Sequence, residues 1–285
     1  MADKEIGDLT TAAALDGTET LHLVQSGNSR KVTSQLLALL AMVNGQCQLV
    51  LDSGSLKLNR HNGFYLWCNG KPCIVPATPL SLAATSLTPA TLYYIYASES
   101  GGTLDALVAS ATAPTTHTDG TQVRTGTTAQ ALVGMAYCVT GPAWADSASQ
   151  RLVASWFNRR KRVAFKQHGA ARSTTSSTLV ELSSADRVEF VSWAGEILAG
   201  YTGSGGSDTV SRSLLTGVGI DGTAPTAFYV ETYISAGVNQ TQNVSHNYPV
   251  AVLGGYHYAS PFGARVIDGT RTWSSAGGAY VALEI

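Results

Sequence analysis

The stretch TLYYIYASESGGTLDALVAS, residues 91–110, decides the fold class of this chain. Its first eight residues are rich in aromatic and β-branched side chains, which is typical of a strand in a protein core. Gly101 and Gly102 supply turn chemistry, and a second run with strand character extends from Leu104 to Ser110. We therefore expect two consecutive strands here, separated by a glycine turn.

The same pattern extends in both directions from residues 91–110. Turn residues separate short apolar runs at 53–55, 61–63 and 69–70, and Asn-Gly at 69–70 is a strong cue for a hairpin. Pro72, Pro76 and Pro79 cannot donate to a sheet ladder, so we expect residues 74–82 to form an edge strand or a connection. Residues 131–140 form another buried run. The sequence predicts an antiparallel sandwich or barrel over residues 46–158.

A second set of strands is expected over residues 159–285. About seven or eight runs with strand composition are separated by turn residues at 203–206, 221–222 and 277–278. No amphipathic helix interrupts them. The sequence therefore predicts a mainly β protein with two antiparallel β-sandwich-like domains, and a jelly roll is the candidate topology for the second.

A small module is expected before the two sandwiches, in residues 1–45. Residues 19–25 alternate apolar and polar side chains, residues 26–29 have turn chemistry, and residues 30–32 resume extended character. Thr33 or Ser34 can then cap a short helix over residues 35–43, with Leu36 and Leu40 on its apolar face. Because a unit of about 40 residues buries too little surface to fold alone, we expect this module to dock on a partner.

Composition limits the classes of partner. Only 13% of the residues are charged, against a typical value of about 25%, and the net charge is −1. This charge gives no general attraction to nucleic acid or to an anionic membrane. No run reaches the roughly 18 apolar residues of a membrane span, and the first residues lack the order of a signal peptide. We expect neither nucleic-acid binding, nor membrane insertion, nor export by a signal peptide.

Catalytic and metal-binding motifs are missing. The sequence contains no G-x-S-x-G elbow, H-E-x-x-H motif, phosphate-binding loop or dinucleotide fingerprint, so we expect no enzyme activity, no cofactor and no metal. A pair of carboxylates for glycan cleavage would leave no local spacing, and the candidates for that alternative are Asp221, Glu231 and Asp268. The four cysteines are interpreted as small buried residues, with disulfides as the alternative outside cells: Cys47, Cys68, Cys73 and Cys138.

Two groups of side chains are candidates for contacts with a ligand or partner. A basic cluster consists of Arg159, Arg160, Lys161 and Arg162. It either binds phosphate groups, or is a solvated linker, or contacts acidic residues of a neighbouring subunit. An aromatic region near the C-terminus contains types that stack on sugar rings or anchor interfaces. The candidates for surface or glycan contact there are Tyr256, Tyr258, Arg265 and Trp273.

The N-terminal residues carry a resemblance to a known class. Residues 6–39 resemble the N-terminal module of many tailed-bacteriophage fibre, spike and minor tail proteins. Matching positions are Ile6, Leu9, Leu15, Gly17, Glu19, Gln25, Arg30, Lys31 and Thr33. Segments 69–76, 92–97, 123–126, 132–137 and 145–160 are similar to a domain of phage and prophage structural proteins, so the resemblance covers roughly the first 160 residues.

The resemblance implies a virion protein that assembles in a bacterial host. In such proteins the N-terminal module attaches to other virion proteins, the middle domain is a spacer and the C-terminal domain is exposed to the host surface. They are usually homotrimers. The expected function is a short trimeric fibre-type appendage, with a neck or collar fibre, a capsid decoration, or a protein that binds or cleaves host glycans as alternatives.

Overall fold

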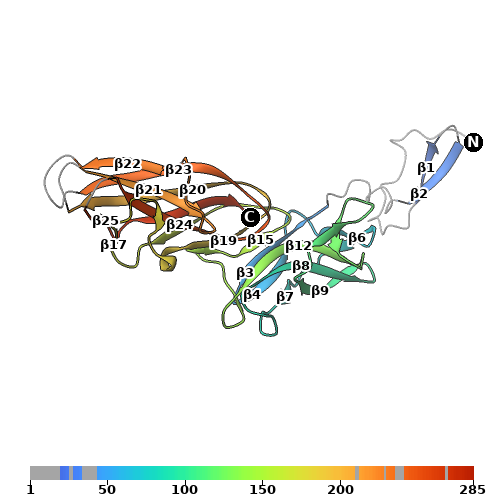
Figure 1. Cartoon of the computed structure of the whole chain (residues 1–285). Coiled ribbons are helices and arrows are strands. Elements are labelled where there is room, and N and C mark those ends of the chain that lie inside the picture. The colour runs from blue at the N-terminus through green and yellow to red at the C-terminus, as the bar shows by residue number, and fades with distance from the viewer. Residues whose placement is uncertain are drawn as a thin grey trace, which may run out of the picture. The chain divides into compact units, whose positions relative to one another are not determined.

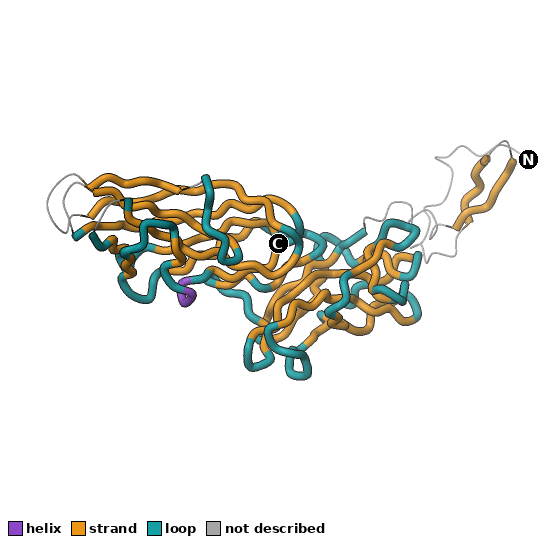
Figure 2. Tube along the Cα trace, viewed as in Figure 1, coloured by secondary structure: helices purple, strands orange, loops and turns teal. Residues whose placement is uncertain are grey.

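The computed structural model describes residues 20–25, 28–33, 44–208, 212–227, 229–234, 241–266 and 269–285. The chain divides into two compact units, Met1–Asn44 and Gly45–Ile285. Strands account for most of the described residues, and the described part contains no α-helix, only the 3₁₀ turn Ser184–Asp186 (Figure 2). The expectation of a mainly β protein is confirmed.

The first unit contains one described hairpin. Strands β1 (Thr20–Gln25) and β2 (Asn28–Thr33) pair antiparallel, with Gln25 opposite Asn28. The two expected strands are present, and Asn28 and Ser29, which were expected in the turn, belong to β2. The helix expected at 35–43 lies outside the described residues. So do Ile6, Leu9, Leu15, Gly17, Glu19, Leu36 and Leu40.

Two sheets make up the first part of the second unit (Figure 1). The larger sheet centres on β8 and β12. Its strands, in sheet order, are β10 (Pro114–Thr116), β11 (Gln122–Arg124), β12 (Gln130–Val139), β8 (Thr91–Ser100), β9 (Thr103–Ser110), β6 (Lys71–Ile74) and β5 (Tyr65–Cys68), with β13 (Ala143–Trp144) and β15 (Val153–Ser155) also paired to β12. The smaller sheet contains β3 (Cys47–Asp52), β4 (Ser55–Arg60) and β7 (Leu80–Leu82).

Backbone geometry explains the hairpins of this part. Gly101 and Gly102 have φ of 61° and 84° and join β8 to β9, as expected from residues 91–110. Asn69 and Gly70, at 56° and 68°, join β5 to β6 in the same way. Two consecutive positive φ values match the twist of a two-residue hairpin, and they are accessible mainly to glycine, asparagine and aspartate. The turn residues read from the sequence therefore fix the order of these strands.

Residues 159–285 form a β-sandwich. One of its sheets contains β14 (Gln150–Arg151), β19 (Val188–Ser192), β24 (Gly255–Arg265), β21 (Arg212–Ile220) and β22 (Tyr229–Ile234), with β18 (Val180–Glu181) paired to β24. The other contains β16 (Lys161–Gln167), β26 (Gly278–Glu284), β20 (Gly195–Ser207), β25 (Arg271–Trp273) and β17 (Arg172–Thr174), with β23 (Thr241–Val252) paired to β20. The register Tyr201↔His246 places both side chains on the inner face.

One of the two hydrophobic clusters of the second unit contains residues of both of its parts. Met135 and Leu152, from the first part, pack in the same cluster as Phe190 and Leu283 of the sandwich. Strand β14 precedes the expected boundary at residue 158, yet it pairs in parallel with β19 of the sandwich. Residues 46–158 and 159–285 are therefore two sheet systems within one compact unit, and a substitution at their contact should affect both.

Candidate functional site

The basic cluster lies where the chain passes from β15 to β16. Asn158 has a positive φ of 52°, and its Nδ2 donates to the carbonyl oxygens of Gly45 and Cys47 at 2.8 Å each. Gln48 returns a hydrogen bond from Nε2 to the Asn158 carbonyl at 2.7 Å. These three bonds join the connection to the start of β3, so the backbone positions of the four basic residues are fixed.

Arg159 is held by two tryptophans. Its guanidinium lies 4.8 Å from the Trp156 ring centroid and 5.2 Å from that of Trp193. The two rings meet edge to face at 4.7 Å, and Trp193 Nε1 donates to the Ser155 carbonyl at 2.9 Å. Burial lowers the pKa of Arg159, and the ring faces offset part of the cost of that burial. Arg159 therefore stabilises the contact between the two parts of the unit.

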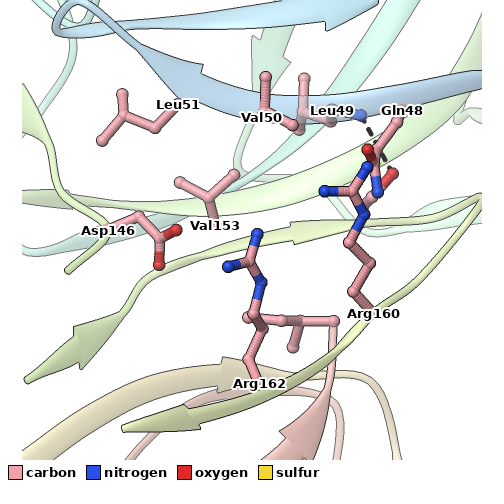
Figure 3. Close-up of a pocket in the computed structure, with 10 residues that line it drawn as sticks. Gln48, Leu49, Val50, Leu51, Asp146, Val153, Arg160 and Arg162 are labelled. Atoms are coloured by element: carbon pink, nitrogen blue, oxygen red, sulfur yellow. Dashed lines mark hydrogen bonds between the residues drawn. The ribbon is translucent and has the colours of Figure 1, made fainter. Parts of the chain in front are cut away.

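Arg160 and Arg162 line a small cleft (Figure 3). The cleft has a volume of about 80 Å³, and we call it the basic cleft. The Arg160 guanidinium lies beside Gln48, and the Arg162 guanidinium lies near Asp146 and Val153. The remaining lining residues are Leu49, Val50, Val153, Ser155 and Ile285. Lys161 lies between the two arginines on β16 and alternates to the other face of the strand, where its register partner is Glu284.

Asp146 is the acidic group of the basic cleft. Burial raises the pKa of its carboxyl group, against the opposite effect of the Arg151 and Arg162 charges. Arg151 Nη1 lies 3.6 Å from Asp146 Oδ1, which is an ion-pair distance and too long for a hydrogen bond. The cleft lining thus contains the guanidinium groups of Arg160 and Arg162, the Asp146 carboxyl group and the last residue, Ile285, whose oxygen accepts from the Arg160 N–H at 2.6 Å.

Two of the four aromatic-region candidates lie on one surface. Tyr256 stacks on Tyr137 with ring centroids 4.0 Å apart, and its hydroxyl donates to Glu189 Oε1 at 2.5 Å. Gln150 Nε2 donates to the other oxygen of Glu189. Burial is the main cause that raises the pKa of Tyr256, and the hydrogen bond to Glu189 raises it further. A hollow of about 310 Å³ adjoins these groups and is lined by Ala90, Tyr137, Val139, Thr140, Gln150 and Glu189.

Tyr258 extends this surface, which we call the tyrosine patch (Tyr137, Glu189, Tyr256, Tyr258). Arg187 lies 4.0 Å above the Tyr258 ring centroid and binds Glu181 through two hydrogen bonds of 2.7 and 2.9 Å. Aromatic faces beside carboxylate and amide groups are the chemistry that binds sugar rings. The patch combines residues from both sequence parts, so local sequence spacing gives no signal for Tyr137 or Glu189.

Trp273 and Arg265 do not belong to the tyrosine patch. The expected surface role of Trp273 is wrong, because its side chain is fully buried and its Nε1 donates to Thr216 Oγ1 at 2.8 Å. Gly263 leaves the space that its ring occupies. Arg265 is half-buried at the end of β24, where its N–H donates to the Ser176 carbonyl.

The cysteines are free and buried. The disulfide alternative for Cys47, Cys68, Cys73 and Cys138 is wrong in this structure, because each thiol lies in the core of the first part. Burial raises the pKa of Cys47 and of Cys68 to about 12. Since the thiolate is the reactive form, these positions contribute to packing and are protected from oxidation.

A buried polar network in the sandwich was missed by sequence reasoning. Asp186 accepts from Arg172 Nε and Nη2 at 2.6 and 2.8 Å and lies 2.8 Å from His168 Nδ1. His168 Nε2 lies 3.2 Å from the Tyr201 hydroxyl. Burial raises the pKa of Asp186, but the bonds from Arg172 and His168 outweigh it and hold the pKa at about 2. The His168 and Asp186 side chains are closed to solvent, so the network stabilises the fold and offers no binding site.

The remaining candidates give no site. Asp221 accepts from the Tyr258 N–H at 3.0 Å and pairs with His257, Glu231 lies on the outer strand β22, and Asp268 lies outside the described residues. Among the described residues, no group of three or more metal-binding side chains comes together. That part of the chain also contains no helix with the length and apolarity of a membrane span.

Comparisons with known proteins identify no family. No protein-family model matches the sequence, and no curated protein sequence matches it. Among solved structures, the chain is similar to the particle of infectious bursal disease virus Gx strain, with 12% identity, a TM-score of 0.30, and coverage of 84% of this chain and 68% of that one.

Two further solved structures are similar to the chain at comparably low TM-scores. Dimeric latent PorU of Porphyromonas gingivalis has 9% identity and a TM-score of 0.31 over 95% of this chain and 24% of its own. The enzymatically active domain of bacteriophage CBA120 tailspike protein 4 has 11% identity and a TM-score of 0.20 over 44% of this chain and 19% of its own. The chain thus spans about a quarter of the PorU chain. All three TM-scores lie below 0.5, so these similarities carry no argument about function.

Proposed function

We propose that this chain is a non-enzymatic structural protein of a tailed-phage virion. It forms a short trimeric fibre-type appendage that attaches to other virion proteins through residues 1–45, and residues 159–285 are available for contact with the host surface. A neck or collar fibre, or a capsid decoration protein, is the alternative within the same class. The proposal combines the sequence resemblance with three features of the structure.

The observation that carries the proposal is the division of the chain into a small N-terminal unit and a large β body. The described part of Met1–Asn44 is a single hairpin, whereas Gly45–Ile285 has its own extensive core. A lone two-stranded hairpin is marginal in water and gains stability by docking. A chain with such an end and a self-contained body suits an attached appendage better than a free enzyme.

A second feature supports self-association. Val163, Phe165 and Leu198 point outward from one sheet of the sandwich and are 54%, 37% and 37% exposed. The register places Val163, Ala282, Leu198 and Pro249 in one row across β16, β26, β20 and β23. A hollow of about 450 Å³ lies along this apolar face. Lys161 and Glu196 border the hollow, so a second copy of the chain can meet the face with opposite charges at its rim.

A third feature supports a surface role for the body and favours the glycan-binding alternative. The tyrosine patch presents a stacked pair of tyrosine rings beside Glu189 and Gln150. A fragment of residues 45–285 that blocks phage adsorption, and loses this effect when free host polysaccharide is added, would favour that alternative. Release of reducing sugar from the polysaccharide would instead favour a protein that cleaves host glycans.

The self-association proposal is tested by molar mass. We expect the full chain to form a trimer of about three times 29.8 kDa in light scattering. Val163→Asp should shift the protein to monomer at micromolar concentration, because a carboxylate buried against an apolar face without a partner weakens the interface by a factor of about 100 or more.

The control replaces an equally apolar residue elsewhere. Leu253→Asp changes a side chain that is 79% exposed in the turn between β23 and β24 and does not line the hollow, so it should leave the trimer intact. Near-ultraviolet circular dichroism checks that both variants are folded. A monomeric wild-type protein, or equal mass changes in both variants, would contradict the proposed interface.

A further inference from the structure

The hollow beside the tyrosine patch has a carboxylate in its wall. Glu189 lines this hollow together with Tyr137, Gln150 and Thr140. One oxygen of Glu189 accepts from the Tyr256 hydroxyl at 2.5 Å, and the other accepts from Gln150 Nε2. A carboxylate has about four lone-pair sites, so each oxygen keeps a site for a further donor. Glu189 can therefore accept hydrogen bonds from a group that enters the hollow.

Glu189 has no basic partner among the residues that the structure describes. The ion pairs of that part of the chain all involve other carboxylates. Arg187, two positions earlier in the chain, is bound to Glu181 through two hydrogen bonds. Arg151, which follows Gln150, pairs with Asp146. The half-buried Glu189 thus carries a negative charge that no described basic side chain compensates.

The aromatic side of the hollow also favours a positive charge. The Tyr137 ring lines the hollow, and the Tyr256 ring stacks on it. Burial raises the pKa of Tyr137, and the charge of Glu189 raises it further, so the Tyr137 hydroxyl lies within the field of the carboxylate. The quadrupole of an aromatic ring attracts a cation to its face. The carboxylate and the ring therefore attract the same kind of ligand.

We propose that the hollow binds the protonated amine of an amino sugar. A primary ammonium group has three N–H donors for the open acceptor sites of Glu189, whereas a quaternary ammonium has none. The Tyr137 ring, the Thr140 hydroxyl and the Gln150 amide are groups that stack on a pyranose ring and bind its hydroxyls.

The size of the hollow agrees with one sugar ring. Its volume of about 310 Å³ lies at the lower end of the range for small-molecule sites. The inference rests on the glycan-binding alternative of the proposed function, and it narrows the ligand of that alternative to a sugar with a free amine.

The test compares sugars that differ in one substituent. The full-length protein is titrated with the methyl glycosides of glucosamine, glucose and N-acetylglucosamine at about pH 6, well below the ordinary pKa of an amine. Saturation-transfer NMR measures the weak affinities expected for single sugars. We expect the glucosaminide to bind more tightly than the other two by about tenfold or more, because it alone carries the ammonium group.

Variants then assign the binding to Glu189. Glu189→Gln keeps the size of the side chain and removes its charge, so it should weaken the glucosaminide by about tenfold and change the glucoside by less than about twofold. Glu231→Gln is the matched control, since it removes the same charge from an exposed position on β22, which β24 and β21 separate from β19. It should change neither affinity. Unchanged thermal unfolding shows that each variant is folded.

Three results would overturn the inference. Equal binding of the glucosaminide and the glucoside, or equal effects of Glu189→Gln and Glu231→Gln, would remove the ammonium site and leave the glycan-binding alternative in place. No binding of the glucosaminide at about 10 mM would also remove the site, and the adsorption assay would then decide the glycan-binding alternative by itself. An acetylated and amidated lysine that binds as tightly as the glucosaminide would remove the role of the sugar ring.

Discussion

Asp186→Ala is expected to lower the stability of the β body by about 3–5 kcal/mol. The substitution leaves the Arg172 guanidinium, the fully buried His168 ring and the Gly169 N–H without their shared acceptor. Removal of this buried carboxylate costs this much because it leaves three donors without an acceptor, and one of them, the His168 ring, is fully closed to solvent. At about 2–4 °C per kcal/mol for a body of this size, the melting temperature in calorimetry should fall by about 6–20 °C.

Glu181→Ala is the matched control for this substitution. Glu181 binds Arg187 with the same two-pronged geometry, but these side chains are 22% and 34% exposed, against 2% for Asp186. Water solvates the Arg187 guanidinium that remains, so the stability of the β body should fall by about 1 kcal/mol or less. Equal losses in the two variants would contradict the assigned role of the buried network.

The same network predicts a pH dependence. The pKa of Asp186 falls from 3.8 to about 2 on folding, so its contribution is complete above about pH 4 and is lost as the pH falls toward 2. The shift corresponds to about 2 kcal/mol. The difference in unfolding free energy between wild type and Asp186→Ala should therefore shrink by this amount between pH 5 and pH 2.

Trp193→Ala is expected to have the second large effect, at the contact between the two sheet systems. The substitution removes the edge-to-face contact with Trp156, one ring face from Arg159 and the hydrogen bond to the Ser155 carbonyl. Truncation of a packed tryptophan costs about 3–5 kcal/mol. Because the lost contacts join residues 46–158 to residues 159–285, the single thermal transition expected for wild type should separate into two.

Trp193→Phe distinguishes the ring from its N–H group. Phenylalanine keeps most of the ring contact and loses the bond to Ser155, so the cost should be about 1 kcal/mol with one transition retained. Differential scanning calorimetry measures both quantities. A single transition at the wild-type temperature in Trp193→Ala would show that the tryptophan pair does not couple the two parts.

Local sequence chemistry predicted the strands and turns well, because those features depend on neighbours in the chain. Gly101-Gly102 and Asn69-Gly70 have the positive φ values that their residue types favour. The β class followed from the same pattern. The predicted boundary at residue 158 did not anticipate that β14 pairs with β19, since parallel pairing of distant segments leaves no local signal.

The candidate sites were less predictable, because burial and partner choice depend on the tertiary fold. Trp273 and Tyr256 look alike in the sequence, yet Trp273 fills the core beside Gly263 and Tyr256 stacks on Tyr137 from the other sheet system. The basic cluster appears as one run of charge. Strand alternation sends Lys161 to one face and Arg160 and Arg162 to the other, while the two tryptophans bind Arg159.

The central claim is that this chain is a virion part attached through its N-terminal unit. The most direct measurement is the amount of tagged protein in purified virions after phage growth in cells that express either the full chain or residues 45–285. We expect the full chain to co-purify with the particles and the shorter chain, folded by circular dichroism, to be depleted by about tenfold or more. Absence of the full chain from virions, or equal incorporation of both chains, would contradict the account.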